Sequence, residues 1–139
     1  MSSGSYSGTA TLEGSVVGYY DGRDFEIDDY ELESLQYYSD DDVYMDKSDF
    51  RDFLSDCMYD IKDLIKQEAV KQGIIVDRNT YADIEAEFEI ETDYSGYWDD
   101  GYFYNYDRWE PPESGFEVGE NRVDISVDIV SAEIKEYES

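Results

Sequence analysis

The clearest pattern in the chain is a strict alternation of apolar and acidic residues from Thr80 to Thr92. One side of this segment carries Ala82, Ile84, Ala86, Phe88 and Ile90, and the other carries Asp83, Glu85, Glu87, Glu89 and Glu91. A period of two is typical of a β-strand with one buried face and one solvent face. The segment therefore predicts a half-buried strand whose outward face is a row of carboxylates.

A helical period precedes this strand. Ser48 is a suitable N-cap, and Gly73 is suited to the position just after the last turn. Between them apolar residues recur every three or four positions: Phe50, Phe53, Leu54, Cys57, Met58, Ile61, Leu64 and Ile65. The opposite side carries Asp52, Asp56, Asp60 and Asp63. This pattern predicts one amphipathic helix that packs on a sheet.

Extended segments flank both elements. The first forty residues predict a hairpin that turns at residues 21–24, where Asp-Gly is a good turn signal. Gly14 allows a bulge or a close neighbour, and a phase shift near Asp28 and Asp29 predicts a second bulge. A last strand is predicted from Asn121 to Tyr137, with a phase change near Val130. Its inward residues are Val123, Ile125, Val127 and Ile129.

The segment from Tyr94 to Glu110 is rich in aromatic residues, including Trp98 and Trp109, and is followed by Pro111 and Pro112. It predicts a hairpin extension at about residues 94–112. Its rings either stabilise that hairpin through cross-strand pairs or form a contact surface for another protein.

Together these elements predict an α+β fold: an antiparallel sheet of four or more strands in the order ββαββ, with the helix on one face. A chain of 139 residues is near the commonest domain size, so residues 1–139 are expected to form a single domain.

The most unusual property of the sequence is its net negative charge. The chain has 37 Asp and Glu, ten Lys and Arg and no His, for a net charge of -27. Its 15 Tyr, six Phe and two Trp supply the apolar surface that disordered acidic chains lack. Duplex DNA carries one charge per ~1.7 Å, so this charge equals about 46 Å of duplex, near the diameter of a compact domain of this length.

The acids are concentrated in rows. Successive outward carboxylates from Asp83 to Glu91 would stand about 6.6 Å apart, of the same order as phosphate spacing. The outward face of any half-buried strand is polar, but this row contains no Lys, Arg or Thr, although like charges on one face destabilise a sheet. A second cluster follows the hairpin turn: Asp24, Glu26, Asp28, Asp29, Glu31 and Glu33. We expect both rows, with Trp98 and Trp109, to bind the partner.

The sequence lacks the residues and motifs of the common catalytic mechanisms. Without His, the chain lacks the usual general base and the commonest transition-metal ligand, and it has no glycine-rich phosphate loop. The acidic segments 40–42 and 99–101 do not follow the spacing of a calcium loop. Cys57 lies on the apolar stripe and is expected to be a buried thiol. We therefore expect no enzyme activity, no cofactor and no metal site.

The N-terminal segment lacks the features of a secretory signal, and no apolar run is long enough to span a membrane. We therefore expect a soluble, cytoplasmic protein. Its charge would repel nucleic acid and anionic lipid, so neither is an expected partner. The expected partner is a basic protein.

In charge character, though in no sequence motif, the chain resembles the acidic DNA-mimic proteins by which bacteriophages block restriction enzymes and CRISPR effectors. The resemblance implies a stoichiometric inhibitor of a DNA-binding protein, such as a nuclease or CRISPR effector, in a bacterial cell. Unpaired edge strands would allow the sheet to form a homodimer, which would lengthen the charge track. The alternatives are an interaction or assembly module that uses the aromatic hairpin, such as a viral accessory or structural component, and a protein whose acidity serves only solubility.

Overall fold

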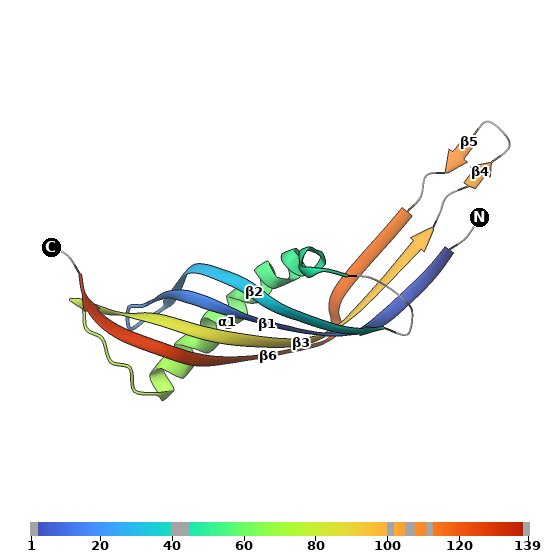
Figure 1. Ribbon diagram of the computed structural model, residues 1–139. Helices are drawn as coiled ribbons and strands as arrows, with labels where there is room; N and C mark the ends of the chain where they lie inside the picture. Colours follow the sequence, from blue (N-terminus) through green and yellow to red (C-terminus); the bar gives the residue numbers. More distant parts are fainter. Residues whose placement is uncertain (1–2, 40–44, 100–101, 105–107, 111–112, 138–139) are drawn as a thin grey trace.

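The computed structural model describes residues 3–39, 45–99, 102–104, 108–110 and 113–137 (Figure 1). One antiparallel sheet in the order β2-β1-β3-β6 contains four long strands: β1 (Ser3–Tyr20), β2 (Phe25–Ser39), β3 (Thr80–Asp99) and β6 (Glu113–Glu136). Helix α1 (Arg51–Lys71) follows the short 3-10 helix η1 (Lys47–Phe50) and crosses one face of this sheet. The predicted α+β fold is confirmed: the helix and the four strands of this sheet follow one another along the chain in the order ββαββ, and the helix packs on one face.

The predicted hairpin at the start of the chain is present. The Asp21 carboxylate accepts hydrogen bonds from the backbone N–H groups of Arg23 (2.8 Å) and Asp24 (2.9 Å), and these bonds lower the pKa of Asp21. Gly22 takes a positive φ of 94°, which favours glycine. The β1–β2 register shifts after Glu13 and after Val17, so the two predicted bulges are confirmed.

The start of the helix differs from the prediction. Asp46, not Ser48, is the cap: its side chain accepts from the Ser48 N–H (3.0 Å), and the Asp49 side chain accepts from the Asp46 N–H (2.9 Å). The reason is that η1 adds a turn before α1, so the N-cap lies two residues closer to the N-terminus than predicted, and Asp46 and Asp49 form a reciprocal capping box there. At the other end, Gly73 takes a φ of 78°, as predicted for the residue after the C-cap.

The core lies between α1 and one face of the sheet. Leu54, Ile61 and Ile65 of the helix stripe are buried against the inward residues of β1 and β3. Gly14 makes room for one of these inward residues, since a Cβ at Gly14 would lie 2.6 Å from the ring of Phe88. The opposite face of the sheet, which we call the open face, is not covered by the helix.

Strands β1, β3 and β6 remain paired and continue past the helix as a narrow arm, so the molecule is elongated rather than compact (Figure 1). β3 extends to Asp99 and β6 begins at Glu113, so the predicted strand limits at residues 92 and 121 are wrong. Residues 94–99 of the aromatic segment pair with residues 113–118 of β6, and at the tip β4 (Tyr102–Tyr104) pairs with β5 (Arg108–Glu110), so the predicted hairpin extension is present and longer than expected. The sequence pattern missed the arm because tyrosine, serine and glycine replace the alternation of aliphatic and acidic residues there.

Candidate functional site: an acidic open face

The carboxylate row of β3 lies on the open face, as predicted. Ala82, Ile84, Ala86, Phe88 and Ile90 are buried on the helix side, so the residues that alternate with them point away from the helix. The ends of the row are paired with cations of β6. Arg122 Nη2 lies 2.6 Å from Glu91 Oε2, and Lys135 Nζ lies 2.7 Å from Asp83 Oδ2. Among the described residues no ion pair involves Glu85, Glu87 or Glu89.

The acidic cluster of β2 reaches the same face. Glu26, Asp29 and Glu31 are the register partners of Tyr19, Val17 and Ser15 on β1. Those three β1 residues are in turn the partners of Asp83, Glu85 and Glu87 on β3. In these three pairs an acid of β2 is therefore matched with an acid of β3 across a single β1 residue, at two strand spacings or about 9.6 Å.

Two further acids of β2 join this face through the bulges. Asp28 and Glu33 are the extra residues at the two register shifts. Asp28 lines a hollow of about 290 Å³ together with Glu85, and Glu33 lines another of about 330 Å³ together with Glu89. The bulges therefore add carboxylates to the open face instead of turning them towards the helix.

Asp24 is the exception among the predicted acids. It lies in the β1–β2 turn, and its carboxylate contacts Lys66 Nζ of α1 at 3.4 Å. Because α1 covers the other face of the sheet, this contact directs Asp24 towards the helix side. Asp24 therefore lies apart from the other five acids of its cluster and does not belong to the open face.

β6 supplies acids that the sequence analysis did not include. Asp124, Asp128 and Glu133 are the register partners of Glu91, Glu87 and Asp83. Their alternation with the inward valines and isoleucines of β6 was the available signal. The acidic surface thus spans the sheet from β2 to β6.

A cluster of tyrosines at one end of the open face was also missed. The rings of Tyr19 and Tyr81 meet edge to face with centroids 6.0 Å apart, and Tyr81 and Tyr137 are 4.9 Å apart. Burial raises the pKa of Tyr19, and the negative charges of Glu26 and Asp28 raise it further. These rings are scattered in the sequence, so no local pattern could have brought them together.

The two predicted tryptophans are placed only through their backbones. Trp98 lies on β3 between Gly4 of β1 and Ser114 of β6, in the arm. Trp109 pairs with Phe103 in the β4–β5 hairpin. Their side chains lie outside the described part of the structure, as do the acidic residues 40–42 and the turn at 100–101.

The cations are unevenly distributed between the two sides of the molecule. Five of them lie on η1 and α1: Lys47, Arg51, Lys62, Lys66 and Lys71. There they are interspersed with the exposed Asp52, Asp56, Asp60 and Asp63. The open-face positions of β1, β2 and β3 carry no Lys or Arg, and Arg122 and Lys135 stand on the outer strand β6.

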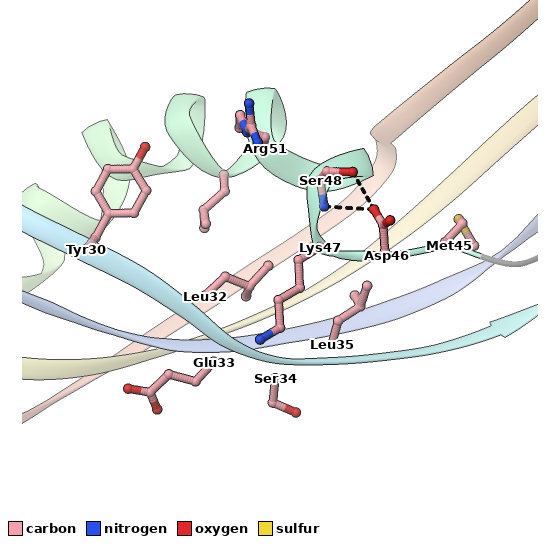
Figure 2. A pocket seen from close by; sticks show the side chains of 11 residues that line it. Tyr30, Leu32, Glu33, Ser34, Leu35, Met45, Asp46, Lys47, Ser48 and Arg51 are labelled. Atoms are coloured by element: carbon pink, nitrogen blue, oxygen red, sulfur yellow. Dashed lines mark hydrogen bonds between the residues drawn. The ribbon is translucent and has the colours of Figure 1, made fainter.

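A cavity of about 880 Å³ lies on the helix side, between β2 and the start of α1 (Figure 2). Leu32, Leu35 and Leu54 line it, with Lys47 and Arg51 beside them. In Figure 2 the side chains of Glu33 and Ser34 point away from these residues, to the other side of β2. The cavity is therefore separate from the open face.

The titratable groups show no catalytic arrangement that we can identify in the described residues. Cys57 is buried, and burial, with a smaller contribution from Asp60 and Asp56, raises the pKa of its thiol to about 11. Such a thiol is protonated at neutral pH and is a poor nucleophile. Within the described ranges no group of three Asp, Glu or Cys side chains is arranged to hold a metal ion, and no helix is long and apolar enough to cross a membrane.

Comparisons with protein families, with curated proteins and with solved structures find no match to this chain.

Proposed function

We propose that this protein is a DNA-mimic inhibitor that presents the open face to the DNA-binding groove of a basic protein, such as a nuclease or CRISPR effector, in the cytoplasm of a bacterial cell. It would act by occupying the groove stoichiometrically, without catalysis or a cofactor. The observation that carries the proposal is the matching of acids on β2 with acids on β3 across β1.

The dimensions of the open face support this proposal. Its two main rows are about 9.6 Å apart, between the widths of the minor groove (~6 Å) and the major groove (~12 Å) that separate phosphate rows in duplex DNA. From Asp83 to Asp93 the open face is about 33 Å long, and its four strands together carry roughly 15 carboxylates along this length. The same length of duplex DNA carries roughly 19 phosphates around its whole circumference. One side of a duplex thus presents no more charge than this face.

The separation of charges argues against acidity that serves only solubility. That role requires charge on the surface but not the removal of cations from one face. Here the helix side mixes both signs, whereas every charged residue on the open-face positions of the three strands β1, β2 and β3 is an acid. The remaining repulsion on one face lowers stability, which is tolerated where function depends on it.

The tyrosine cluster favours a second candidate, an interaction module that depends on aromatic contacts. Tyrosine is enriched among the residues that dominate binding energy in protein interfaces. Tyr19 and Tyr81 lie beside the acids of the open face, so aromatic contacts and charge would act at the same interface. The two candidates differ in which substitutions slow association and which speed dissociation.

The experiment is affinity capture from bacterial lysates with three immobilised proteins: the natural chain, a variant with Glu85, Glu87 and Glu89 changed to Gln, and a control with Asp52, Asp56 and Asp60 changed to Asn. Both variants lose the same charge. We expect a basic DNA-binding protein to elute at clearly lower salt from the open-face variant than from the other two.

Equal loss of the captured protein from both variants would show that bulk charge alone is responsible. In the same preparation, the protein should bind neither duplex nor single-stranded DNA at physiological salt, because both are polyanions. A gel shift with DNA would contradict the proposal directly.

A further inference from the structure

The outer edge of β6 is an unpaired strand edge with exposed apolar residues. β6 ends the sheet, so its outward N–H and C=O groups have no neighbouring strand in the described structure (Figure 1). Val123, Val130, Ile134 and the adjoining Tyr137 are 41%, 54%, 50% and 48% exposed. An exposed edge with apolar side chains is a template for pairing with another strand.

The part of this edge that can pair continuously is limited by two irregularities. The β3–β6 register shifts between Thr92 and Tyr94, and again beside Val130. Between them Val123 to Ile129 follows an uninterrupted register with β3. This stretch contains no Pro or Lys, residues by which natural proteins commonly protect an edge, and its two charged residues, Asp124 and Asp128, are both on the open face.

We propose that this edge pairs with the β6 edge of a second copy of the chain, in an antiparallel register centred on Ile125. In a two-fold pair with this centre, Val123 faces Val127 of the second copy on the helix side. On the open face Asp124 faces Ser126, and Arg122, which directly precedes the continuous stretch, faces Asp128. The two-fold axis makes each of these pairs occur twice.

The charges favour this register over its neighbours. Side chains alternate between the two faces of a strand, so each residue can exchange its partner only for one two positions away. The nearest alternative registers are therefore those centred one residue before or after Ile125. A centre at residue 124 places Asp124 opposite its own copy, and a centre at 126 places Asp124 opposite Asp128. Both neighbours oppose like charges, whereas the centre at Ile125 opposes Arg122 to Asp128.

The position of the edge also explains how two strongly acidic molecules can approach. Arg122 and Lys135, the two cations on open-face positions of the sheet, both stand on β6. The acids of β2 lie at the opposite edge of the sheet, three strands away. The join is therefore at the least negative border of the open face, although the net charge of -27 on each copy still opposes it.

The pairing would double the surface proposed for partner binding, and its functional use rests on the proposed function. Eight strands at about 4.8 Å give a continuous sheet roughly 38 Å wide. A two-fold axis perpendicular to an antiparallel pair places both helices on one side and both acidic faces on the other. The pairing itself does not depend on any DNA-binding partner.

Sedimentation equilibrium of the purified full chain from 1 µM to 1 mM, at NaCl concentrations from 0.05 to 1 M, tests the proposal. We expect a monomer–dimer equilibrium that shifts towards dimer as salt rises, because salt screens the repulsion between copies. Binding of a basic partner weakens with salt, so this trend separates the dimer from the proposed function. A monomer under all conditions, or a dimer that dissociates as salt rises, would overturn the proposal.

A charge exchange tests the register. Asp128→Arg places Arg opposite Arg122 in both symmetry-related pairs and should weaken dimerisation about tenfold, whereas adding Arg122→Asp should restore it. Dimerisation that is unchanged by Asp128→Arg would refute this register. As a measurement on the unaltered chain, hydrogen exchange at Val123 to Ile129 should slow as protein concentration rises. Protection that appears only after a basic protein is added would assign the edge to a strand of that partner instead.

Discussion

Replacing Glu87 by Gln should stabilise the folded protein, because this residue directly faces another acid across the sheet and no ion pair among the described residues offsets the repulsion. Its register partner on β6 is Asp128. Glu85 faces no acid on either neighbouring strand, and Glu89 faces an acid, Glu13, on β1. Directly opposed side chains in an antiparallel pair have Cβ atoms about 5 Å apart. Glu87 and Asp128 therefore form a like-charge pair that only folding creates.

The size of this repulsion follows from Coulomb's law. Two unit charges about 5 Å apart in bulk water repel by about 0.8 kcal/mol. Screening reduces this to about 0.45 kcal/mol at 0.15 M salt, about 0.7 at 0.01 M and about 0.15 at 1 M. The neighbours Glu85 and Glu89 contribute less, because residues two positions apart also remain close in the unfolded chain.

A double-mutant cycle isolates this energy. Urea unfolding of the natural chain, Glu87→Gln, Asp128→Asn and the double variant should give a repulsive coupling of about 0.4 kcal/mol at 0.15 M salt, largest at low salt. The matched control pairs Glu89→Gln with Asp128→Asn, because these residues are not directly opposed. A coupling of zero, an attractive coupling, or equal coupling in the control would refute the register between β3 and β6 on which the open face depends.

Three further predictions concern the core, the thiol and the aromatic segment. Ile61→Ala should lower the free energy of unfolding by about 2–5 kcal/mol because Ile61 is fully buried, and the exposed Asp56→Ala should change it by less than about 0.5 kcal/mol; equal effects in thermal melts would mean that the helix is oriented differently. Burial raises the pKa of the Cys57 thiol to about 11, so the contribution of the protonated thiol to stability is complete below pH 9 and is lost as pH rises towards 11. Alkylation of Cys57 at pH 8 should therefore require unfolding, and rapid labelling of the native protein would contradict the burial. Changing Trp98 and Trp109 to Ala should speed dissociation from a captured partner, with little change in salt dependence, if the aromatic segment is the contact surface; unchanged dissociation would leave the acids as the main contact.

The parts of the fold that could be predicted from the sequence are those with a simple period. The alternation around Phe88 and the three-four spacing around Ile61 each have one buried side, so the hydrophobic effect fixes which residues face the core. The Asp21–Gly22 turn was predictable because its local hydrogen bonds and positive φ depend on neighbouring residues alone.

Features that depend on tertiary contacts could not be read in this way. The six acids after the hairpin turn were predicted as one cluster, but a contact with Lys66 on a distant helix directs Asp24 away from the other five. The meeting of Tyr19, Tyr81 and Tyr137 needs three strand ends to adjoin. The matching of β2 acids with β3 acids depends on the order of strands in the sheet and on two bulges, which hydrophobic periodicity locates only approximately.

The most direct test of DNA mimicry is a competition between this protein and duplex DNA for the captured partner. A fluorescent duplex is bound to the partner, and its anisotropy is followed as this protein is added at constant ionic strength. We expect the duplex to be displaced stoichiometrically, with a midpoint that rises in proportion to DNA concentration, and with much weaker displacement by the variant lacking the charges of Glu85, Glu87 and Glu89. Formation of a ternary complex, in which the partner holds the duplex and this protein together with unchanged affinity for DNA, would contradict the account.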